Sequence, residues 1–253
     1  MKAPLVDTHA HLCDPAFDHD LATVCRRAAD AGVTAIIAVG EDLPDAHRNL
    51  KLATQYPAIK PAAGLYPTHL DPEAANQMVA FIRQNQDHLC AIGEVGLDFW
   101  AVKDPAGKEL QQEIFKTFIQ LSNELDLPLN VHSRSAGRQA IALLQALDAR
   151  KVQLHAFDGK FTTAQPALEA GYFFSMPPSV IRSRQKQKLL KHLPLDCLLA
   201  ESDSPVLGPD PAQRNEPANL VMAVEAIAAS KGVSLDVVTD HLYVNTVRLY
   251  GPL

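Results

Sequence analysis

Short apolar stretches rich in β-branched residues recur along the chain, separated by segments in which apolar positions have helical spacing. Apolar runs that end near glycine, proline or polar residues are typical of buried strands. We expect strands at Pro4–Val6, Val33–Val39, Ile59–Leu65, Cys90–Glu94, Pro128–Val131, Val152–His155, Tyr172–Ser175 and Cys197–Ala200. We expect helices at Asp18–Ala31, Pro44–Gln55, Pro72–Gln86, Lys108–Leu125, Ala136–Leu147, Thr163–Ala170 and Ile181–His192, with two closing helices near Pro217–Ser230 and Leu235–Tyr250.

This alternation predicts an α/β fold. The expected strands are continuous apolar runs, so both faces of the sheet must be covered, as in a parallel sheet. Eight strand–helix units in a chain of 253 residues match a closed (β/α)₈ TIM barrel. An open doubly wound sheet is the alternative, but no G-x-G-x-x-G motif follows the first strand. We therefore expect one TIM-barrel domain over residues 1–253.

Composition agrees with a folded domain that has a substantial core, since 47% of the residues are hydrophobic and 21% are charged. No apolar run approaches the roughly 18 residues that cross a membrane, and the N-terminal sequence does not resemble a signal peptide. The four cysteines are scattered without a C-x-x-C pair. Reduced thiols and a cytoplasmic location are the expectation.

The net charge of −6 argues against a long electrostatic groove for nucleic acid. It does not exclude a local site, because bound divalent cations would offset several carboxylates. An enzyme that acts on a few nucleotides at a chain end is therefore compatible with this composition.

Two histidines follow the first expected strand. His9 and His11 are two positions apart, so in an extended chain they point to the same side, and Asp7 lies just before them. Paired imidazoles beside an acid are a metal-ligand arrangement. The alternative is a pair of polar residues that merely closes a strand.

Further histidines and acids fall where other expected strands end. The candidate ligands are His9, His11, Glu94, His132, His155 and Asp203. In a TIM barrel these strand ends meet at the C-terminal rim, where active sites lie. Six candidates exceed the needs of one catalytic zinc and suit two divalent ions with a bridging carboxylate. Imidazole and carboxylate ligands suit Zn, Mn or Fe, and Mg with more water.

The order of these motifs resembles the TatD family of metal-dependent hydrolases, among the amidohydrolase-like barrels. The matching stretches are Asp7–Leu12, Gly93–Asp98, Val131–Arg134, His155–Gly159, Glu201–Pro205 and Arg214–Pro217, and they extend over nearly the whole chain. The resemblance implies one metal on His9, His11 and Asp203, and a second on His132 and His155. It also implies that Glu94 bridges the two metals, and that the reaction is phosphodiester hydrolysis, typically of DNA.

Other residues suggest contacts to substrate. Tyr66 stands where the family often has histidine, and His69 is the candidate to replace that contact, with a surface histidine as the alternative. Arg134 and Arg214 are expected in rim loops, and arginine suits bidentate contacts to phosphate. We thus expect His69, Arg134 and Arg214 to bind substrate.

Three features have two readings. The basic run Arg182–Lys188 is expected to be a solvated helix face, and a contact to a nucleic-acid backbone is the alternative. Asp98 either orients a metal ligand or packs in its loop. Phe99 and Trp100 either plug the barrel mouth, which we favour, or form a wall on which a base stacks.

The sequence thus predicts a metal-dependent hydrolase, a TatD-type deoxyribonuclease that trims DNA ends. Glu94 and Asp203 are the expected catalytic residues, with Asp203 taking the proton of a metal-activated water. An ester or amide hydrolase on the same barrel, such as one that deacylates aminoacyl-tRNA, is the alternative. A metal-binding protein without catalysis is a third reading, which the full set of six ligands disfavours.

Overall fold

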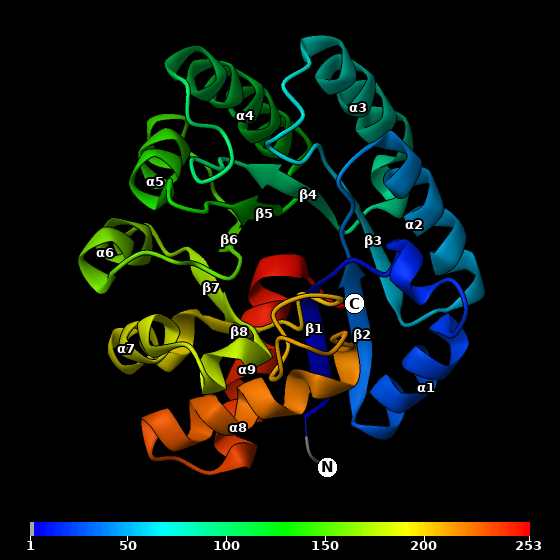
Figure 1. Cartoon of the computed structure of the whole chain (residues 1–253), viewed down its shortest axis with the longest axis vertical. Helices are drawn as coiled ribbons and strands as arrows, with labels where there is room; N and C mark the ends of the chain where they lie inside the picture. The colour runs from blue at the N-terminus through cyan, green and yellow to red at the C-terminus, as the bar shows by residue number, and fades with distance from the viewer. Residues whose placement is uncertain (1–2) are drawn as a thin grey trace.

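A computed structural model describes residues 3–253, so the first two residues of the expected domain lie outside the described part. Eight parallel strands stand side by side in sequence order, and helices surround them (Figure 1). The strands are β1 (Leu5–Ala10), β2 (Val33–Ala38), β3 (Ile59–Ala63), β4 (Ala91–Gly96), β5 (Leu129–His132), β6 (Val152–Leu154), β7 (Phe173–Met176) and β8 (Leu198–Ala200). The expected TIM barrel is confirmed.

Each strand but the last is followed by a helix that leads to the next strand, and two helices follow β8. The helices are α1 (Leu21–Asp30), α2 (Leu43–Gln55), α3 (Pro72–Asn85), α4 (Pro105–Leu125), α5 (Gly137–Ala146), α6 (Phe161–Glu169), α7 (Arg184–His192), α8 (Leu220–Lys231) and α9 (Leu235–Tyr250). No helix within residues 3–253 is long and apolar enough to cross a membrane.

Three helices begin three residues later than expected, and the helix expected from Lys108 begins three residues earlier, at Pro105. Helices expected from Asp18, Ile181 and Pro217 begin at Leu21, Arg184 and Leu220 instead. A 3₁₀ turn precedes each of the three late starts, at Pro15–Phe17, Pro178–Ile181 and Pro217–Asn219. Proline opens every one of these turns, and its fixed φ suits the first position of a tight turn without extending an α-helix back along the chain.

The strand ends near the candidate ligands also shift. β1 continues to Ala10, four residues past its expected end at Val6, so His9 lies inside the strand and only His11 follows it. Glu94 lies inside β4, which continues to Gly96, and was wrongly expected to close that strand. His132 is the last residue of β5 rather than the first after it, whereas His155 directly follows β6. Glu94, His132 and His155 still lie at or next to the carboxyl end of a strand.

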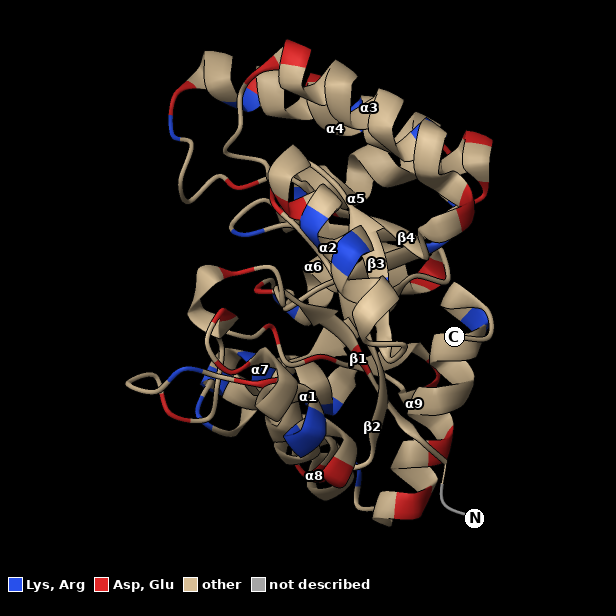
Figure 2. Ribbon diagram, turned by 90° about the vertical axis from the view of Figure 1, so that its right-hand side faces the viewer, with Lys and Arg blue, Asp and Glu red and all other residues tan. Residues whose placement is uncertain are grey.

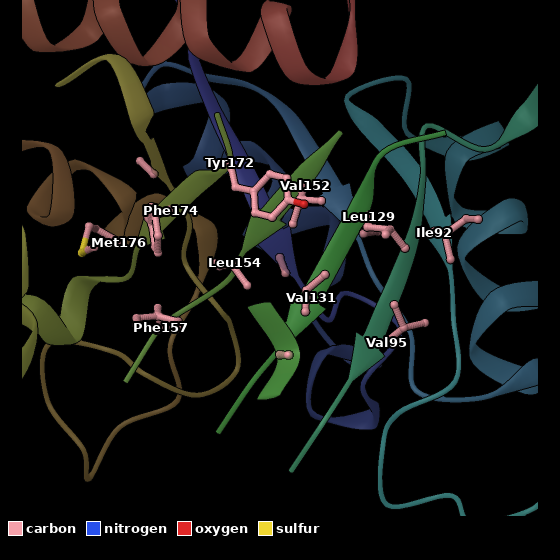
Figure 3. Packing of buried hydrophobic residues seen from close by; sticks show 14 of the residues in the cluster. Ile92, Val95, Leu129, Val131, Val152, Leu154, Phe157, Tyr172, Phe174 and Met176 are labelled. Atoms are coloured by element: carbon pink, nitrogen blue, oxygen red, sulfur yellow. The ribbon is translucent and has the colours of Figure 1, made fainter. Parts of the chain in front are cut away.

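Alternate strand residues point toward the helices and form the main core. Figure 3 shows this packing for β4 to β7, with Ile92, Val95, Leu129, Val131, Val152, Leu154, Phe174 and Met176 labelled. Fully buried helix residues such as Phe115 and Phe118 on α4 belong to the same cluster. Because the period of a strand is two, the residues between these apolar ones face the barrel interior.

The interior of the barrel is apolar at one end and polar toward the rim. Leu249 and Tyr250 at the end of α9 pack against inward residues of the strands and close the N-terminal end. The hydroxyl of Tyr250 donates to Oε1 of Gln153 at 2.5 Å. The side-chain nitrogen of Asn130 donates to that hydroxyl at 3.2 Å and to the backbone oxygen of Thr8 at 2.9 Å. These buried amides form a fixed layer beneath the rim.

The barrel closes between β8 and β1 at the rim. The backbone N–H of Asp203 donates to the carbonyl of His9 at 2.9 Å, and the N–H of His11 donates to the carbonyl of Ser204 at 2.8 Å. The first histidine pair is thereby placed beside the acid that follows the last strand.

Charge is interspersed over the molecule. In Figure 2 acidic and basic segments alternate over the face shown, including the loops at its left edge. This distribution agrees with the expectation that any contact with a polyanion is local.

Candidate metal centre

Asn130 sets the orientation of His9. Nδ1 of His9 lies 2.7 Å from Oδ1 of Asn130, and the amide nitrogen of Asn130 is already used as a donor to Thr8. The hydrogen-bond network therefore assigns the imidazole proton to Nδ1, which donates to Asn130. The lone pair of Nε2 is left facing the rim, as in histidines that bind a metal.

One set of potential ligands gathers around this Nε2 atom. It lies 3.1 Å from Nε2 of His11 and 3.5 Å from Oδ1 of Asp203, while the corresponding atoms of His11 and Asp203 are 3.7 Å apart. All three residues can place a ligand atom within 4.8 Å of the others. His9 and Asp203 are buried, and the side chain of His11 is 12% exposed.

A second set gathers around the other side of Glu94. Oε1 of Glu94 lies 2.6 Å from Nδ1 of His132 and 2.8 Å from Nε2 of His155. The two imidazole nitrogens are 3.2 Å apart. His9, Glu94 and His155 also form a group whose ligand atoms lie within 4.8 Å of one another, so the two sets are contiguous.

Glu94 faces both sets with different atoms. Its Oε1 atom is directed to His132 and His155, whereas Oε2 lies 3.3 Å from Nε2 of His11 and 3.6 Å from Nε2 of His9. A carboxylate that shares its oxygens in this way has the geometry of a bridging ligand.

The donor set fits cations. Nε2 of His132 lies 3.1 Å from Oδ2 of Asp98, so its N–H can donate to this carboxylate. The lone pair of Nδ1 then faces the carboxylate oxygen of Glu94, and two acceptors at 2.6 Å require a proton or a metal ion between them. Imidazole with carboxylate is a ligand chemistry of divalent transition metals. The contact between Asp98 and Nε2 of His132 supports the interpretation that Asp98 orients a metal ligand.

Without metal, the imidazoles of His11 and His132 hold protons where a metal ion would bind. Burial lowers the pKa of His11 and of His132, but the carboxylate of Glu94 outweighs it and raises both to about 9. Burial would raise the pKa of Glu94, yet the charges of His155 and His132 hold it well below its usual range. Burial instead dominates at His9, where it lowers the pKa. Metal ions and protons must therefore compete for the same nitrogens.

A cavity of about 550 Å³ opens beside this cluster. Five of the six candidate ligands, all except His9, line this cavity, and the lining also includes Glu41, Tyr66, Arg134, Asp158 and Lys186. A concave, partly polar hollow next to convergent titratable groups is the usual form of an active site.

The three expected substrate contacts lie in different places. Arg134 lines the cavity, as expected. Arg214 instead pairs with Asp20 through Nη2 at 2.6 Å, lies over the ring of Phe17, and is absent from the cavity wall within the described residues. His69 is exposed and likewise does not line this cavity in residues 3–253. Tyr66 does line it, with its hydroxyl 3.5 Å from Oδ2 of Asp98.

Trp100 does not plug the barrel mouth. It is 55% exposed, and the guanidinium of Arg134 lies over its ring at 3.7 Å from the ring centre. Phe99 is the more buried of the two and packs against the main core. The favoured reading is therefore wrong for Trp100, because its loop carries the indole outward to pack on Arg134.

Sequence reasoning missed two residues that matter to the site. Asn130 was read as part of an apolar strand, although it lies two residues before His132 and so shares its inward face. Lys186 was placed on a solvated helix face, but it is buried, and burial lowers the pKa of its ammonium. Its spacing of three and four residues from buried Leu189 and Leu190 is the signal that places it on the inner face.

Several known proteins are similar to this chain in sequence and in fold. The model of a family described as TatD related DNase matches residues 6–251. A human protein named deoxyribonuclease TATDN3 is 44% identical over 261 residues, which cover 98% of this chain and 95% of that protein. A Salmonella typhimurium protein named 3'-5' ssDNA/RNA exonuclease TatD is 30% identical over 242 residues, covering 90% and 92%. The crystal structure of a TatD homologue from Escherichia coli has a TM-score of 0.91 at 26% identity and covers 100% of both chains.

Proposed function

The chain belongs to the TatD-related DNase family of metal-dependent hydrolases, and on this premise we propose that it hydrolyses DNA from a chain end with two divalent ions. The observation that carries the proposal is the division of the Glu94 oxygens between two imidazole sets beside one cavity. The Salmonella relative is named an exonuclease, which supports the proposal that hydrolysis begins at a chain end.

We assign His9, His11 and Asp203 to one ion and His132 and His155 to the other, with Glu94 shared. Zn, Mn or Mg is the ion proposed. When bound, the ions would make water more acidic and offset charge that develops on phosphoryl oxygens. The protein's part is to hold six ligand side chains in place, five of them buried, with Asn130 and Asp98 fixing two of the imidazoles.

Asp203 is proposed to accept the proton of the attacking water. Its carboxylate lines the cavity and stands next to the first histidine pair, so it is within reach of a water molecule that enters there. Arg134 is proposed to contact phosphate from the loop between β5 and α5. Stacking on Trp100 limits the motion of its guanidinium, which lowers the entropy that ordering it would cost.

Hydrolysis of a single-stranded, end-labelled oligonucleotide tests this function. The protein is stripped of metal and reloaded with Mg, Mn or Zn, and Glu94→Ala is assayed beside it. Glu109→Ala, which removes an exposed carboxylate on α4, is the matched control.

Stepwise shortening that requires metal and disappears only in Glu94→Ala supports the proposal. Absence of cleavage by the fully loaded wild-type protein would overturn it. Ester and amide substrates, including aminoacyl-tRNA, would then be assayed with the same panel.

A further inference from the structure

Lys186 is a buried cation in the wall of the proposed active-site cavity. It lies in the first turn of α7, and the residue is only 7% exposed. Arg184 and Lys188, its basic neighbours on either side, are exposed. The chain thus turns one charge of a basic run inward, to the side on which the metal cluster lies.

The protein gives this ammonium little direct compensation. Nζ donates to the carbonyl oxygen of Ala156 at 2.5 Å. An ammonium has three donors, and within residues 3–253 no carboxylate forms an ion pair with Lys186 at 4.0 Å or less. Glu201, Asp203 and Asp158 act on it at longer range. A buried charge is costly unless it is paired, so a further anionic partner is expected.

The start of α7 gives a second, independent reason to expect an anion near Lys186. Its first turn contains no acid and carries Arg184 and Lys186, although the positive end of a helix dipole disfavours cations there. Ser183 caps the helix and, with Gln185, also lines the cavity. An anion held in the cavity would offset both the buried ammonium and the helix terminus.

We propose that Lys186 contacts a non-bridging oxygen of the phosphate that is hydrolysed. This inference rests on the proposed function and adds a substrate-binding residue to it. Lys186 donates hydrogen bonds and keeps its proton. Arg134, in the loop after β5, lines the same cavity, so the two side chains together bring two positive charges to the phosphate.

The competing role for Lys186 is structural. By holding the Ala156 carbonyl it could position the loop that follows His155. This role predicts that loss of the ammonium impairs metal loading or stability, whereas a phosphate contact predicts that both are kept. Lys186→Gln separates the two, because an amide can still donate to Ala156 but carries no charge.

The test compares Lys186→Met, Lys186→Gln and Lys186→Arg with Lys188→Met, the control at an exposed position of the same helix. Calorimetry measures binding of inorganic phosphate to the metal-loaded proteins, and metal content is determined for each variant. Hydrolysis is measured on bis(p-nitrophenyl) phosphate, which has a single phosphate, and on single-stranded DNA.

We expect the Met and Gln variants to keep their metal and to lose roughly tenfold to hundredfold in kcat/KM on both substrates, as for a lost charged hydrogen bond. Phosphate binding should weaken in parallel, Lys186→Arg should recover part of both, and Lys188→Met should match the wild type. If Lys186→Met does not fold, Lys186→Gln decides.

Three outcomes would overturn the inference. The first is unchanged phosphate binding and hydrolysis in Lys186→Gln. The second is a loss of hydrolysis with DNA alone, which would place the contact at a flanking phosphate. The third is a loss of hydrolysis that is proportional to a fall in metal content. A wild-type protein that cleaves neither substrate would refute the proposed function instead. The phosphate-binding comparison would still show whether Lys186 holds a phosphate.

Discussion

Nδ1 of His9 lies 2.7 Å from Oδ1 of Asn130, and this contact determines which nitrogen of the imidazole faces the ligand cluster. Asn130 is itself held by the backbone of Thr8 and by the hydroxyl of Tyr250. The last helix of the chain is thereby connected to the first candidate metal ligand through a buried amide. The candidate centre therefore depends on the barrel interior as well as on the rim.

Replacing Asn130 by Ala should weaken metal binding without abolishing the fold. Loss of a hydrogen bond that orients a ligand lowers metal affinity by roughly tenfold to a hundredfold. Titration of metal-stripped protein with Zn or Mn measures this affinity directly. Asn123→Ala is the control, because it removes a structural amide that donates to the carbonyl of Leu147 away from the site. Equal affinities in the two variants would show that Asn130 does not orient His9.

The metal-free protein should lose stability as the pH rises from 6.5 to about 9. The pKa values of His11 and His132 are raised to about 9, so over this range the native state keeps protons that the unfolded state has released. Such a difference lowers the free energy of unfolding as the pH increases. His9 has the opposite shift, and its contribution is lost only as the pH falls below 6.5.

Urea denaturation of stripped and metal-loaded protein at pH 6.5, 7.5 and 9 tests whether the free energy of unfolding falls as the pH rises. The midpoint of the stripped protein should fall across the series. The loaded protein should gain stability relative to the stripped protein at the higher pH, because fewer protons then compete for the ligand nitrogens. A midpoint of the stripped protein that rises over this range would contradict the account.

The two rim arginines should respond differently to truncation. Arg134→Ala should lower kcat/KM by roughly tenfold or more, since Arg134 lines the cavity and would lose a charged contact to phosphate. Arg214→Ala should leave kcat/KM within about threefold, because surface ion pairs contribute little. Steady-state kinetics on single-stranded DNA at one metal concentration provides the comparison. A larger loss in Arg214→Ala than in Arg134→Ala would reverse the assignment.

Much of the fold was readable from the sequence. The apolar runs placed all eight strands to within a few residues, since buried parallel strands have few other sequence patterns. The six candidate ligands could be found because chemistry in such barrels is confined to strand ends. The structure brings these residues together, and their roles as ligands stay a prediction that metal binding must test.

Other features depend on contacts that no local pattern encodes. Arg214 is fixed by Asp20, which lies 194 positions earlier in the chain, so its direction away from the cavity could not be read from its loop. The burial of Lys186 was not predicted, because a basic run usually lies on a solvated helix face. Its helical spacing from the buried residues Leu189 and Leu190 nevertheless indicates that it lies on the inner face of α7.

Replacing Asp203 by Asn should remove hydrolysis while the protein still folds. The substitution keeps the size of the side chain and the backbone bonds that close the barrel at His9, but it removes the proposed proton acceptor. A decrease in kcat of roughly a hundredfold or more is expected, with metal content measured beside it. Full activity in Asp203→Asn would exclude its proposed role.

Glu94 is proposed to join two metal sites in one centre. Metal stoichiometry, measured by elemental analysis after equilibrium dialysis of wild-type and Glu94→Gln protein against Zn or Mn, tests this proposal most directly. We predict two ions per chain in the wild type and one or fewer in Glu94→Gln. Two ions retained by Glu94→Gln, or a single ion bound by the wild type at saturation, would contradict the account.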